Sequence, residues 1–398
     1  MRKILIISIS IKILILIIIS LLKNGDIGGY NTNSIESDDI RYEAGALYYS
    51  QNANSIIDVD TFTYAFEQFG DYTGYSESFS LWYWLVCIIT YLFKYTFVLR
   101  IINILFSALT AYYIYKLGSI LFNKKAGKYA LIIYSFNPYF LFFPLFLYKD
   151  QFIAMIMVQL FYYLYSYFTS NKKKYLFYVL IVLSLFTFLR DGFSVLLIAS
   201  VLLLLFIREQ EYSNRFKLKS FYYLLPILII YIYFFTYNYI ENSDIIQRKL
   251  LAYVIERTNN ESDTIAMFQI SSLSDFYKLP FSFIFALLQP INLTSKILSV
   301  SGFVGVINLF GIFLACGNIL AFFDKKIRGL NFTKIINALF IITLITSLGI
   351  SRHYYFMLPF YVIFLSAYII KGINFRNTLL SSLILTFLIG VYFFTKII

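Results

Sequence analysis

Two adjacent carboxylates, Asp38 and Asp39, lie in a charged stretch that also holds Arg41 and Tyr42, which are candidates to contact a substrate. A carboxylate beside an acceptor hydroxyl can act as a general base, taking the proton as the new bond forms. Paired carboxylates can instead hold a divalent metal such as Mg²⁺ or Mn²⁺, which would bridge a phosphate leaving group. A third interpretation is an acidic turn that caps a helix beginning near Ile40, because Asp is a good N-cap residue.

Other charged residues interrupt long apolar segments, and several of them suit the binding of a phosphorylated ligand. Lys149 could bind a phosphate as a point charge, and Asp150 could orient the lysine or a sugar hydroxyl. The same pair also fits an interfacial turn with a snorkelling lysine. Arg190 could meet an anionic partner such as a lipid phosphate, or form a salt bridge with Asp191 or Asp150.

Further candidates lie later in the chain. Arg352 could neutralise a phosphate or diphosphate leaving group, because a guanidinium matches the geometry of phosphate oxygens. His353, the single histidine, could be a metal ligand or a proton shuttle, although a lone histidine more often makes a local hydrogen bond. Arg248 belongs to a basic group, with Lys249 and Arg257, that could form a second phosphate site.

Several motifs of soluble enzymes are absent from the sequence. It has no Walker-type glycine loop, no Gly-x-Ser-x-Gly and no Cys or His metal spacing. Cys87 and Cys316 each lie in an apolar run, so a disulfide is not expected. The sequence therefore disfavours a hydrolytic motor and a nucleotide-sugar enzyme of the soluble type.

The elements that position the candidate residues must be membrane helices. Of 398 residues, 60% are hydrophobic and only 14% are charged, which is too apolar for a soluble globule. The net charge is +12, and the charged residues are separated along the chain: basic residues lie in short loops and acidic residues crowd in one long loop. That division is typical of membrane topology and argues against a nucleic-acid partner. The fold class predicted is an all-α polytopic membrane protein.

The apolar runs and basic loops predict about eleven crossings, in a range of about 10 to 12. The predicted crossings are 4–22, 97–122, 131–147, 152–168, 175–189, 193–207, 221–240, 298–323, 335–350, 354–370 and 378–394. The run 80–95 is expected to be an outer juxtamembrane helix, because a single crossing between Phe79 and Lys124 places every basic loop in the cytoplasm. The N-terminus is then cytoplasmic, and Lys12 in the first helix faces the bundle or snorkels.

These helices are expected to form a single integral-membrane domain over 1–398, with two long outer loops. The first loop, 23–96, holds the paired carboxylates and the juxtamembrane helix 80–95. The second, 241–297, holds an interfacial or re-entrant helix at 280–290, because its apolar run lies between two prolines and is too short to span. The charged groups near positions 38, 149, 190 and 352 then lie on one outer side.

Four groups of residues, in this order, resemble the GT-C class of membrane glycosyltransferases, which includes protein O-mannosyltransferases, aminoarabinose transferases and bacterial family-39-like enzymes. They are Asp38 to Ala46; Leu99 to Asn103 with the basic turn Asn123 to Gly127; Asn137-Pro138 with Tyr148-Lys149-Asp150; and Arg352-His353-Tyr354 with Pro359. The resemblance covers most of residues 1–210 and the remainder loosely. It implies a GT-C-like fold, with Asp38 as the catalytic acidic residue and Asp39 assisting it or binding metal. The second outer loop departs from the family, because no donor-binding residues can be matched there.

The charged groups and the resemblance together predict an inverting glycosyltransferase of the bacterial cytoplasmic membrane, active on the extracytoplasmic face. It would move a sugar from a polyprenyl-phosphate-linked donor to a surface glycan or a lipid-linked acceptor. Asp38 would be the base, while Lys149, Arg190 and Arg352 would stabilise the carrier phosphate. Membrane lipids are the expected surroundings.

Two other functions stay open on the sequence. A polymerase of lipid-linked polysaccharide repeat units would need two phosphate sites, and the group around Arg248 could supply the second. A lipid-linked glycan flippase should have polar residues lining a path at mid-helix, and Lys12 is the main candidate. A membrane scaffold would not require acidic and basic clusters at one level.

Overall fold

The chain folds as a bundle of helices with a small lobe on one side. The computed structural model describes residues 1–22, 38–69, 81–189, 191–212, 309–346, 355–370 and 372–397, and within these ranges it contains helices and no strand. In chain order the helices are α1 (Arg2–Leu22), α2 (Asp38–Asn52), α3 (Val59–Phe69), α4 (Leu81–Phe93), α5 (Phe97–Leu121), α6 (Lys124–Phe136), α7 (Pro138–Phe142), α8 (Lys149–Ser170), α9 (Lys173–Thr187), α10 (Asp191–Tyr212), α15 (Leu309–Phe323), α16 (Lys325–Gly329), α17 (Asn331–Thr346), α18 (Leu358–Ile369) and α19 (Gly372–Ile397). The predicted all-α fold class is confirmed.

Three of the described helices are long and apolar enough to cross a membrane. They are Arg2–Leu21, Phe97–Leu121 and Lys149–Ser170, of 20, 25 and 22 residues. Each corresponds to a crossing predicted from the sequence. The total of about eleven crossings stays a prediction.

The residues of the predicted crossing 131–147 do not form one continuous helix, and that they cross the membrane stays a prediction. Helix α6 ends at Phe136, and the chain continues through α7 and a 3-10 turn, Phe143–Leu145. The break falls at Asn137, which has an extended conformation (φ −61°, ψ 126°), as a residue before proline prefers. Its side chain accepts a hydrogen bond from the Tyr139 N–H at 2.9 Å and so caps α7. The chain therefore turns inside the bundle before α8 begins.

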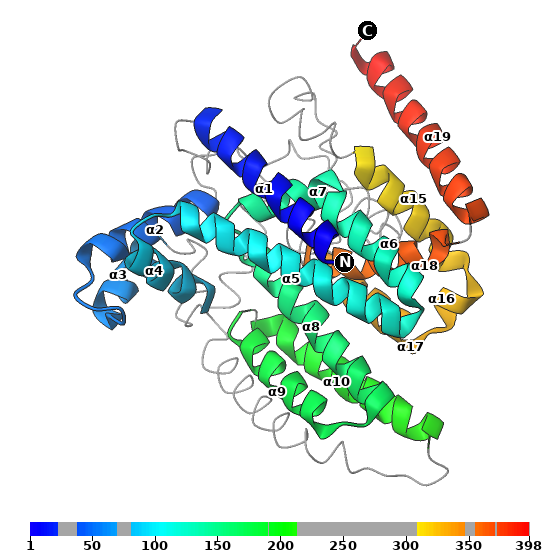
Figure 1. Ribbon diagram of the computed structural model, residues 1–398, viewed down its shortest axis with the longest axis horizontal. Helices are drawn as coiled ribbons and strands as arrows, with labels where there is room; N and C mark the ends of the chain where they lie inside the picture. The colour runs from blue at the N-terminus through cyan, green and yellow to red at the C-terminus, as the bar shows by residue number, and fades with distance from the viewer. Residues whose placement is uncertain are drawn as a thin grey trace.

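Helices α2, α3 and α4 form an aromatic lobe beside the bundle, at the left of Figure 1. Its core is made of Tyr49, Phe62, Ala65, Tyr83, Trp84 and Cys87. Phe62 stacks on Trp84 with ring centroids 4.0 Å apart and an interplanar angle of 12°. The predicted juxtamembrane helix 80–95 is present as α4, which has 13 residues and is too short to cross a bilayer. Its position relative to the membrane stays a prediction.

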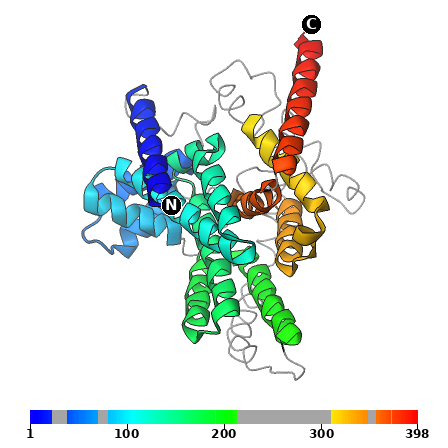
Figure 2. The same cartoon turned by 45° about the vertical axis from the view of Figure 1, so that its right-hand side comes forward.

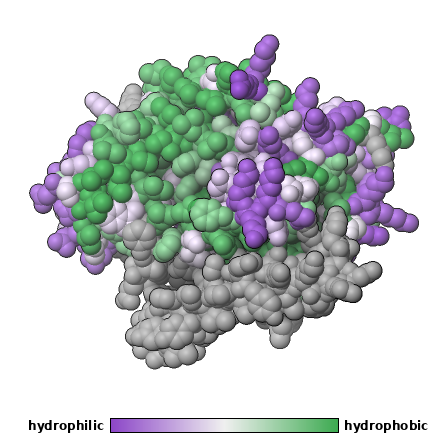
Figure 3. All heavy atoms as spheres, turned by 60° about the horizontal axis from the view of Figure 1, so that its bottom comes forward, coloured by the Kyte–Doolittle hydropathy of each residue, from purple (hydrophilic) through white to green (hydrophobic). Residues whose placement is uncertain are grey.

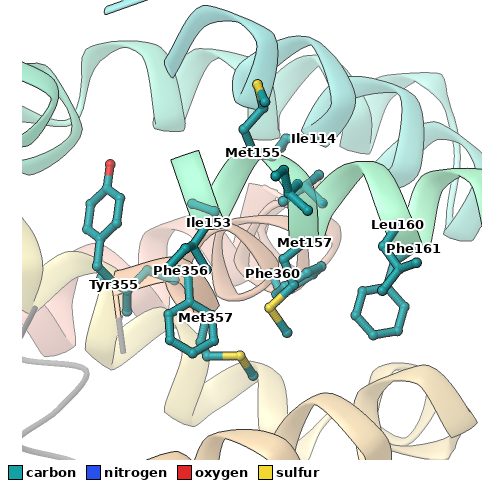
Figure 4. Close-up of a cluster of buried hydrophobic side chains, with 14 of the residues drawn as sticks. Ile114, Ile153, Met155, Met157, Leu160, Phe161, Tyr355, Phe356, Met357 and Phe360 are labelled. Atoms are coloured by element: carbon teal, nitrogen blue, oxygen red, sulfur yellow. The ribbon is translucent and has the colours of Figure 1, made fainter. Parts of the chain in front are cut away.

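The bundle core is centred on α5, α6, α8 and α18, and the two views in Figures 1 and 2 show these helices packed together. Figure 4 shows Ile153, Met157 and Phe161 of α8 among side chains such as Phe356 and Phe360, which are brought in by α18 and the turn before it. All five side chains are at most 2% exposed. Close packing of this kind fixes how α8 sits against its neighbours.

The surface of the molecule has a broad apolar area between hydrophilic patches. Figure 3 shows hydrophobic residues over much of the face in view, with hydrophilic side chains gathered in separate groups. On α1, exposed apolar residues include Ile6 at 62%, Leu14 at 57% and Leu21 at 74%. Such exposure is costly in water and favourable against lipid tails, which fits an integral membrane protein.

Replacing Gly127 by alanine is expected to destabilise the bundle. A Cβ atom at this position would lie 2.3 Å from Ser119 Oγ and 2.4 Å from the Tyr115 carbonyl oxygen, so α5 and α6 would have to move apart. Overpacking of this kind typically costs about 1–3 kcal/mol. Gly329→Ala is the matched control, because a Cβ there meets nothing within 4 Å. Thermal unfolding of the purified protein in detergent checks this; equal unfolding temperatures for the two variants would contradict it.

Candidate active site

The first turn of α2 is fixed to α5 by a buried ion pair. Helix α2 begins at Asp38, so both paired carboxylates lie at a helix N-terminus, where the helix dipole favours negative charge. Arg100, in the first turn of α5, places Nη1 3.1 Å from both carboxylate oxygens of Asp39. The side chains of Arg100 and Asp39 are 1% and 0% exposed. This contact joins the lobe to the bundle.

The same guanidinium holds two further acceptors. Arg100 Nη2 donates to Glu43 Oε2 at 2.8 Å, and Nη1 also donates to the Leu145 carbonyl at 2.9 Å. Glu43 in turn accepts a hydrogen bond from the Thr96 hydroxyl. Asp39 and Glu43 are four residues apart, so they lie on one face of α2. One arginine therefore binds two carboxylates and a backbone carbonyl at once.

The segment that leads into α8 is held by the same group of side chains. The Leu147 N–H donates to Asp39 Oδ1 at 2.6 Å, and the Leu147 carbonyl accepts from Trp82 Nε1 at 3.1 Å. One residue earlier, the Phe146 carbonyl accepts from the Asn103 side-chain amide. Helix α8 begins two residues after Leu147, so these bonds place its first turn close to the first turn of α2.

The electrostatics of Asp39 reflect its burial and its partners. Burial raises the pKa of the Asp39 carboxyl. The Arg100 guanidinium and the Leu147 N–H act in the opposite direction, but the pKa stays above its usual value. Glu43 adds a second negative charge and raises the Asp39 pKa further. With two carboxylates on one guanidinium, the buried group has an excess of acidic side chains.

A stripe of buried polar residues continues from Arg100 along one face of α5. Asn103, Ser107 and Thr110 follow Arg100 at steps of three, four and three residues, and all three are 0% exposed. Ser107 accepts a hydrogen bond from Lys12 Nζ at 2.6 Å. Lys12 is 1% exposed, so it faces the bundle and does not snorkel. The stripe joins α5 to α1.

The stripe ends in a hydrogen-bonded group that joins α5, α8 and the turn before α18. Gln151 Nε2 donates to Thr110 Oγ1 at 3.1 Å, and Gln151 Oε1 accepts from Tyr355 Oη at 2.6 Å. Tyr355 also stacks on Phe143, with ring centroids 3.7 Å apart. Gln151 directly follows Asp150, so these hydrogen bonds fix the orientation of the first turn of α8. Asp150 itself is buried at 5% exposure.

The predicted site residues can now be placed. Asp38 is the first residue of α2 and precedes the buried Asp39; the structure describes its backbone and not its side chain. Arg41 and Tyr42 are half-buried in the first two turns of α2. Tyr42 packs edge-on against Trp82, with ring centroids 6.5 Å apart.

Other predicted site residues either begin α8 or cannot be placed. Lys149 is half-buried and Asp150 buried at the start of that helix. The remaining candidates lie outside the described residues: Arg190, Arg248, Arg352 and His353. The structure thus brings the 38–43 stretch close to the start of α8 and gives no position for the later cations.

Asp39 does not fit the predicted role of metal ligand in this arrangement. Both of its oxygens accept hydrogen bonds from Arg100, and a divalent cation there would be repelled by the guanidinium. Within the described ranges, no group of three His, Cys, Asp or Glu side chains could hold a metal. We therefore assign no step to a metal at Asp39.

Sequence reasoning missed the central residue of this site. Arg100 lies in the first turn of an apolar helix, where a lone arginine could equally have been an interfacial anchor. The signal that could have identified it is the spacing of Arg100, Asn103, Ser107 and Thr110, which repeats the period of a helix face. Buried polar residues at this spacing require partners, and a carboxylate is the natural partner of the arginine.

A comparison with protein families bears on the class of protein to which this chain is similar. The model of the dolichyl-phosphate-mannose-protein mannosyltransferase family matches residues 80–239. The match confirms the resemblance to GT-C glycosyltransferases and supports a membrane glycosyltransferase of the GT-C type. No curated protein and no solved structure matches the chain. The matched residues include Arg100 and the start of α8, whereas Asp38 and Asp39 precede them.

Replacing Arg100 by methionine is expected to lower the stability of the protein strongly. The change leaves the buried Asp39 and the Glu43 carboxylate without their cation, and breaking a buried ion pair on one side typically costs about 3–5 kcal/mol. Arg100→Lys should be intermediate, because lysine keeps the charge but loses the planar fork. Thermal unfolding in detergent checks this: the unfolding temperature should fall from the unaltered protein to Arg100→Lys and further to Arg100→Met.

Adding Asp39→Asn to Arg100→Met provides the control for this prediction. The second change removes the uncompensated charge, so the double variant should recover part of the lost stability. If the double variant lost as much stability as the Arg100→Met and Asp39→Asn single variants together, the ion pair would not be the cause of either loss.

Proposed function

We propose that the protein transfers a sugar from a polyprenyl-phosphate-linked donor to a surface glycan or lipid-linked acceptor, with inversion, on the extracytoplasmic face of a bacterial cytoplasmic membrane. The observation that supports this most directly is the bond between Asp39 and Leu147. It holds the acidic first turn of α2 beside the first turn of α8. A base and a phosphate-binding cation are thereby available at one end of the bundle. The family match supplies the reaction class.

In the proposed reaction Asp38 is the general base. It accepts the proton of an acceptor hydroxyl while that oxygen attacks the anomeric carbon of the donor sugar. The bond from this carbon to the carrier phosphate oxygen breaks, and the phosphate leaves with the electron pair. Lys149, in the first turn of α8, is placed to neutralise the leaving phosphate, and Arg190 and Arg352 are proposed to assist it. Attack opposite the leaving group inverts the anomeric centre.

Asp39 is better suited to positioning than to chemistry. Its oxygens are occupied by Arg100 and by the Leu147 N–H, and its side chain is fully buried. It cannot reach an acceptor hydroxyl without breaking the ion pair. We therefore propose that Asp39 and Arg100 hold the backbone of α2 so that the neighbouring Asp38 has a fixed place. Arg41 is proposed to contact the substrate, whereas Tyr42 packs against Trp82 and Tyr83 and so helps to hold α2 against α4.

The buried polar stripe argues against the flippase alternative. A path for a glycan requires polar side chains that water or the sugar can reach. Lys12, Ser107, Thr110 and Gln151 are each at most 1% exposed and bond to one another across packed helices. Their arrangement favours a structural core over a path. No observation on the described residues favours the polymerase alternative.

Asp38→Asn is expected to abolish transfer while the protein accumulates normally. An amide cannot accept the proton, and loss of a general base typically lowers the rate by about 10²–10⁴-fold. Asp60→Asn is the matched control, because Asp60 is an exposed aspartate at the start of α3 in the same loop. Analysis of cell-surface glycans, with the membrane level of each variant measured alongside, checks the prediction.

The outcomes separate the proposed functions. Loss of one sugar or linkage supports transfer, whereas chains of a single repeat unit would indicate a polymerase. Unchanged glycans at normal protein level would overturn the assignment of Asp38.

Transfer activity is expected to survive chelation of divalent cations. The Arg100 guanidinium already supplies the positive charge beside Asp39, so no metal is needed to hold that carboxylate. Transfer from a polyprenyl-phosphate sugar by the purified protein, with and without EDTA, measures this. Activity lost in EDTA and restored by Mg²⁺ or Mn²⁺ would show that Asp38 acts through a metal.

A further inference from the structure

A second polar site lies at the opposite end of α5 and α8 from the Asp39–Arg100 pair. There the helices enclose a hollow of about 360 Å³. Its lining includes Tyr115, Lys116 and Ser119 of α5, Lys124 at the start of α6, Tyr162 of α8 and Tyr175 of α9. The α8 residues in the lining run from Tyr162 to Ser170, which places the hollow about 20–32 Å from Lys149 at a rise of 1.5 Å per residue. The two sites are therefore distinct.

Both charged side chains in the lining of the hollow are lysines, Lys116 and Lys124. Between Glu77 and Asp191 the sequence contains a single acidic residue, Asp150, and that residue lies at the far end of α8. Further exposed lysines are next to the lining residues along the chain: Lys125, Lys128, Lys172, Lys173 and Lys174. A concave surface whose lining charges are positive concentrates anions.

The lysines also occupy positions that a helix dipole disfavours. Lys124 and Lys125 begin α6, and Lys173 and Lys174 begin α9. The N-terminus of a helix carries partial positive charge, so cations in the first turn are unfavourable there without an anion. An anionic group in the hollow would offset this repulsion at both helices at once.

The hydrogen-bonding groups of the hollow suit a ligand that only accepts. Ser119 already donates to the Tyr115 carbonyl at 2.7 Å within its own helix. By contrast, the phenol hydroxyls of Tyr115, Tyr162 and Tyr175 make no hydrogen bond to any part of the chain that the structure describes. Three phenol donors and two ammonium groups match the oxygens of a phosphate.

An apolar strip on α9 begins just beyond the hollow. Phe177, Ile181 and Leu185 recur at steps of four residues and are 60%, 41% and 38% exposed. Such spacing places the three side chains on one face of the helix, where lipid acyl chains would cover them. Because Phe177 is only two residues after Tyr175, the hollow lies at the level where acyl chains give way to lipid phosphates.

We propose that this hollow binds the phosphate of an anionic membrane lipid. Lys116 and Lys124 neutralise the phosphate, and the phenol hydroxyls donate to its oxygens. The site is separate from the one proposed for catalysis, so a lipid bound here is a stabilising or regulating ligand and is not the sugar donor.

Native mass spectrometry of the full-length protein in detergent tests the proposal. Phosphatidylglycerol is added in increasing amounts, and the lipid that stays bound is counted. The Lys116→Gln/Lys124→Gln variant should bind about tenfold more weakly or worse, because two charge-assisted contacts are removed. Lys325→Gln/Lys326→Gln is the matched control: it removes the same charge from exposed residues at the start of α16, outside the lining, and should bind within about twofold of the unaltered protein.

Three outcomes would overturn the proposal. Equal losses in the two variants would show only general attraction to the basic end. Equal binding of phosphatidylcholine would show that the anionic charge is not recognised. Displacement of the lipid by inorganic phosphate at the same concentration would assign the hollow to a free ion. None of these readouts depends on glycosyl transfer, so each is independent of the proposed catalytic role of Asp38.

Discussion

Arg100 is the residue on which the arrangement of the candidate site depends. A guanidinium that is 1% exposed has lost its water, and its charge and donors must be satisfied by protein groups. Two different parts of the chain supply three such groups: Asp39 and Glu43 from α2, and the Leu145 carbonyl from the segment before α8. Because one planar group binds all three, none can shift without leaving a buried donor or acceptor without its partner. The lobe, α5 and the start of α8 are therefore positioned together.

The break at Asn137 is what makes this convergence possible. If α6 had continued as one helix through 131–147, the Leu147 N–H would have been bonded to the Phe143 carbonyl inside that helix. Pro138 ends the helix and the chain turns, which leaves the Leu147 N–H available to Asp39 and brings the Leu145 and Phe146 carbonyls to Arg100 and Asn103. An apparent defect in a membrane helix thus provides the polar backbone groups of the site. Irregular backbone at such depth is tolerated where protein groups satisfy it.

Much of the helical framework could be predicted from the sequence, because apolar length and charge distribution are local properties. The crossings at 97–122 and 152–168 and the short helix at 80–95 appear close to their predicted bounds. The break at 131–147 was missed, since the apolar run continues through Pro138. The position of Asp39 was missed for another reason: its partner Arg100 is 61 residues away, and no local pattern states which acid an arginine will meet. Long-range pairing is decided by packing.

The two ends of α8 differ in a way that connects the candidate site to the membrane. Acidic side chains of α2 and α8 gather at the end that begins with Lys149, whereas the connection from α8 to α9, just beyond Ser170, contains Lys172, Lys173 and Lys174 and no acid. Basic residues near membrane helices are retained in the cytoplasm, because the positive-inside rule sets orientation by Lys and Arg in short loops. We expect the Asp39–Arg100 end to face outward for that reason. A sugar on an amphiphilic carrier would then reach Asp38 from within the bilayer plane, with its phosphate at the level where α2 and α8 begin.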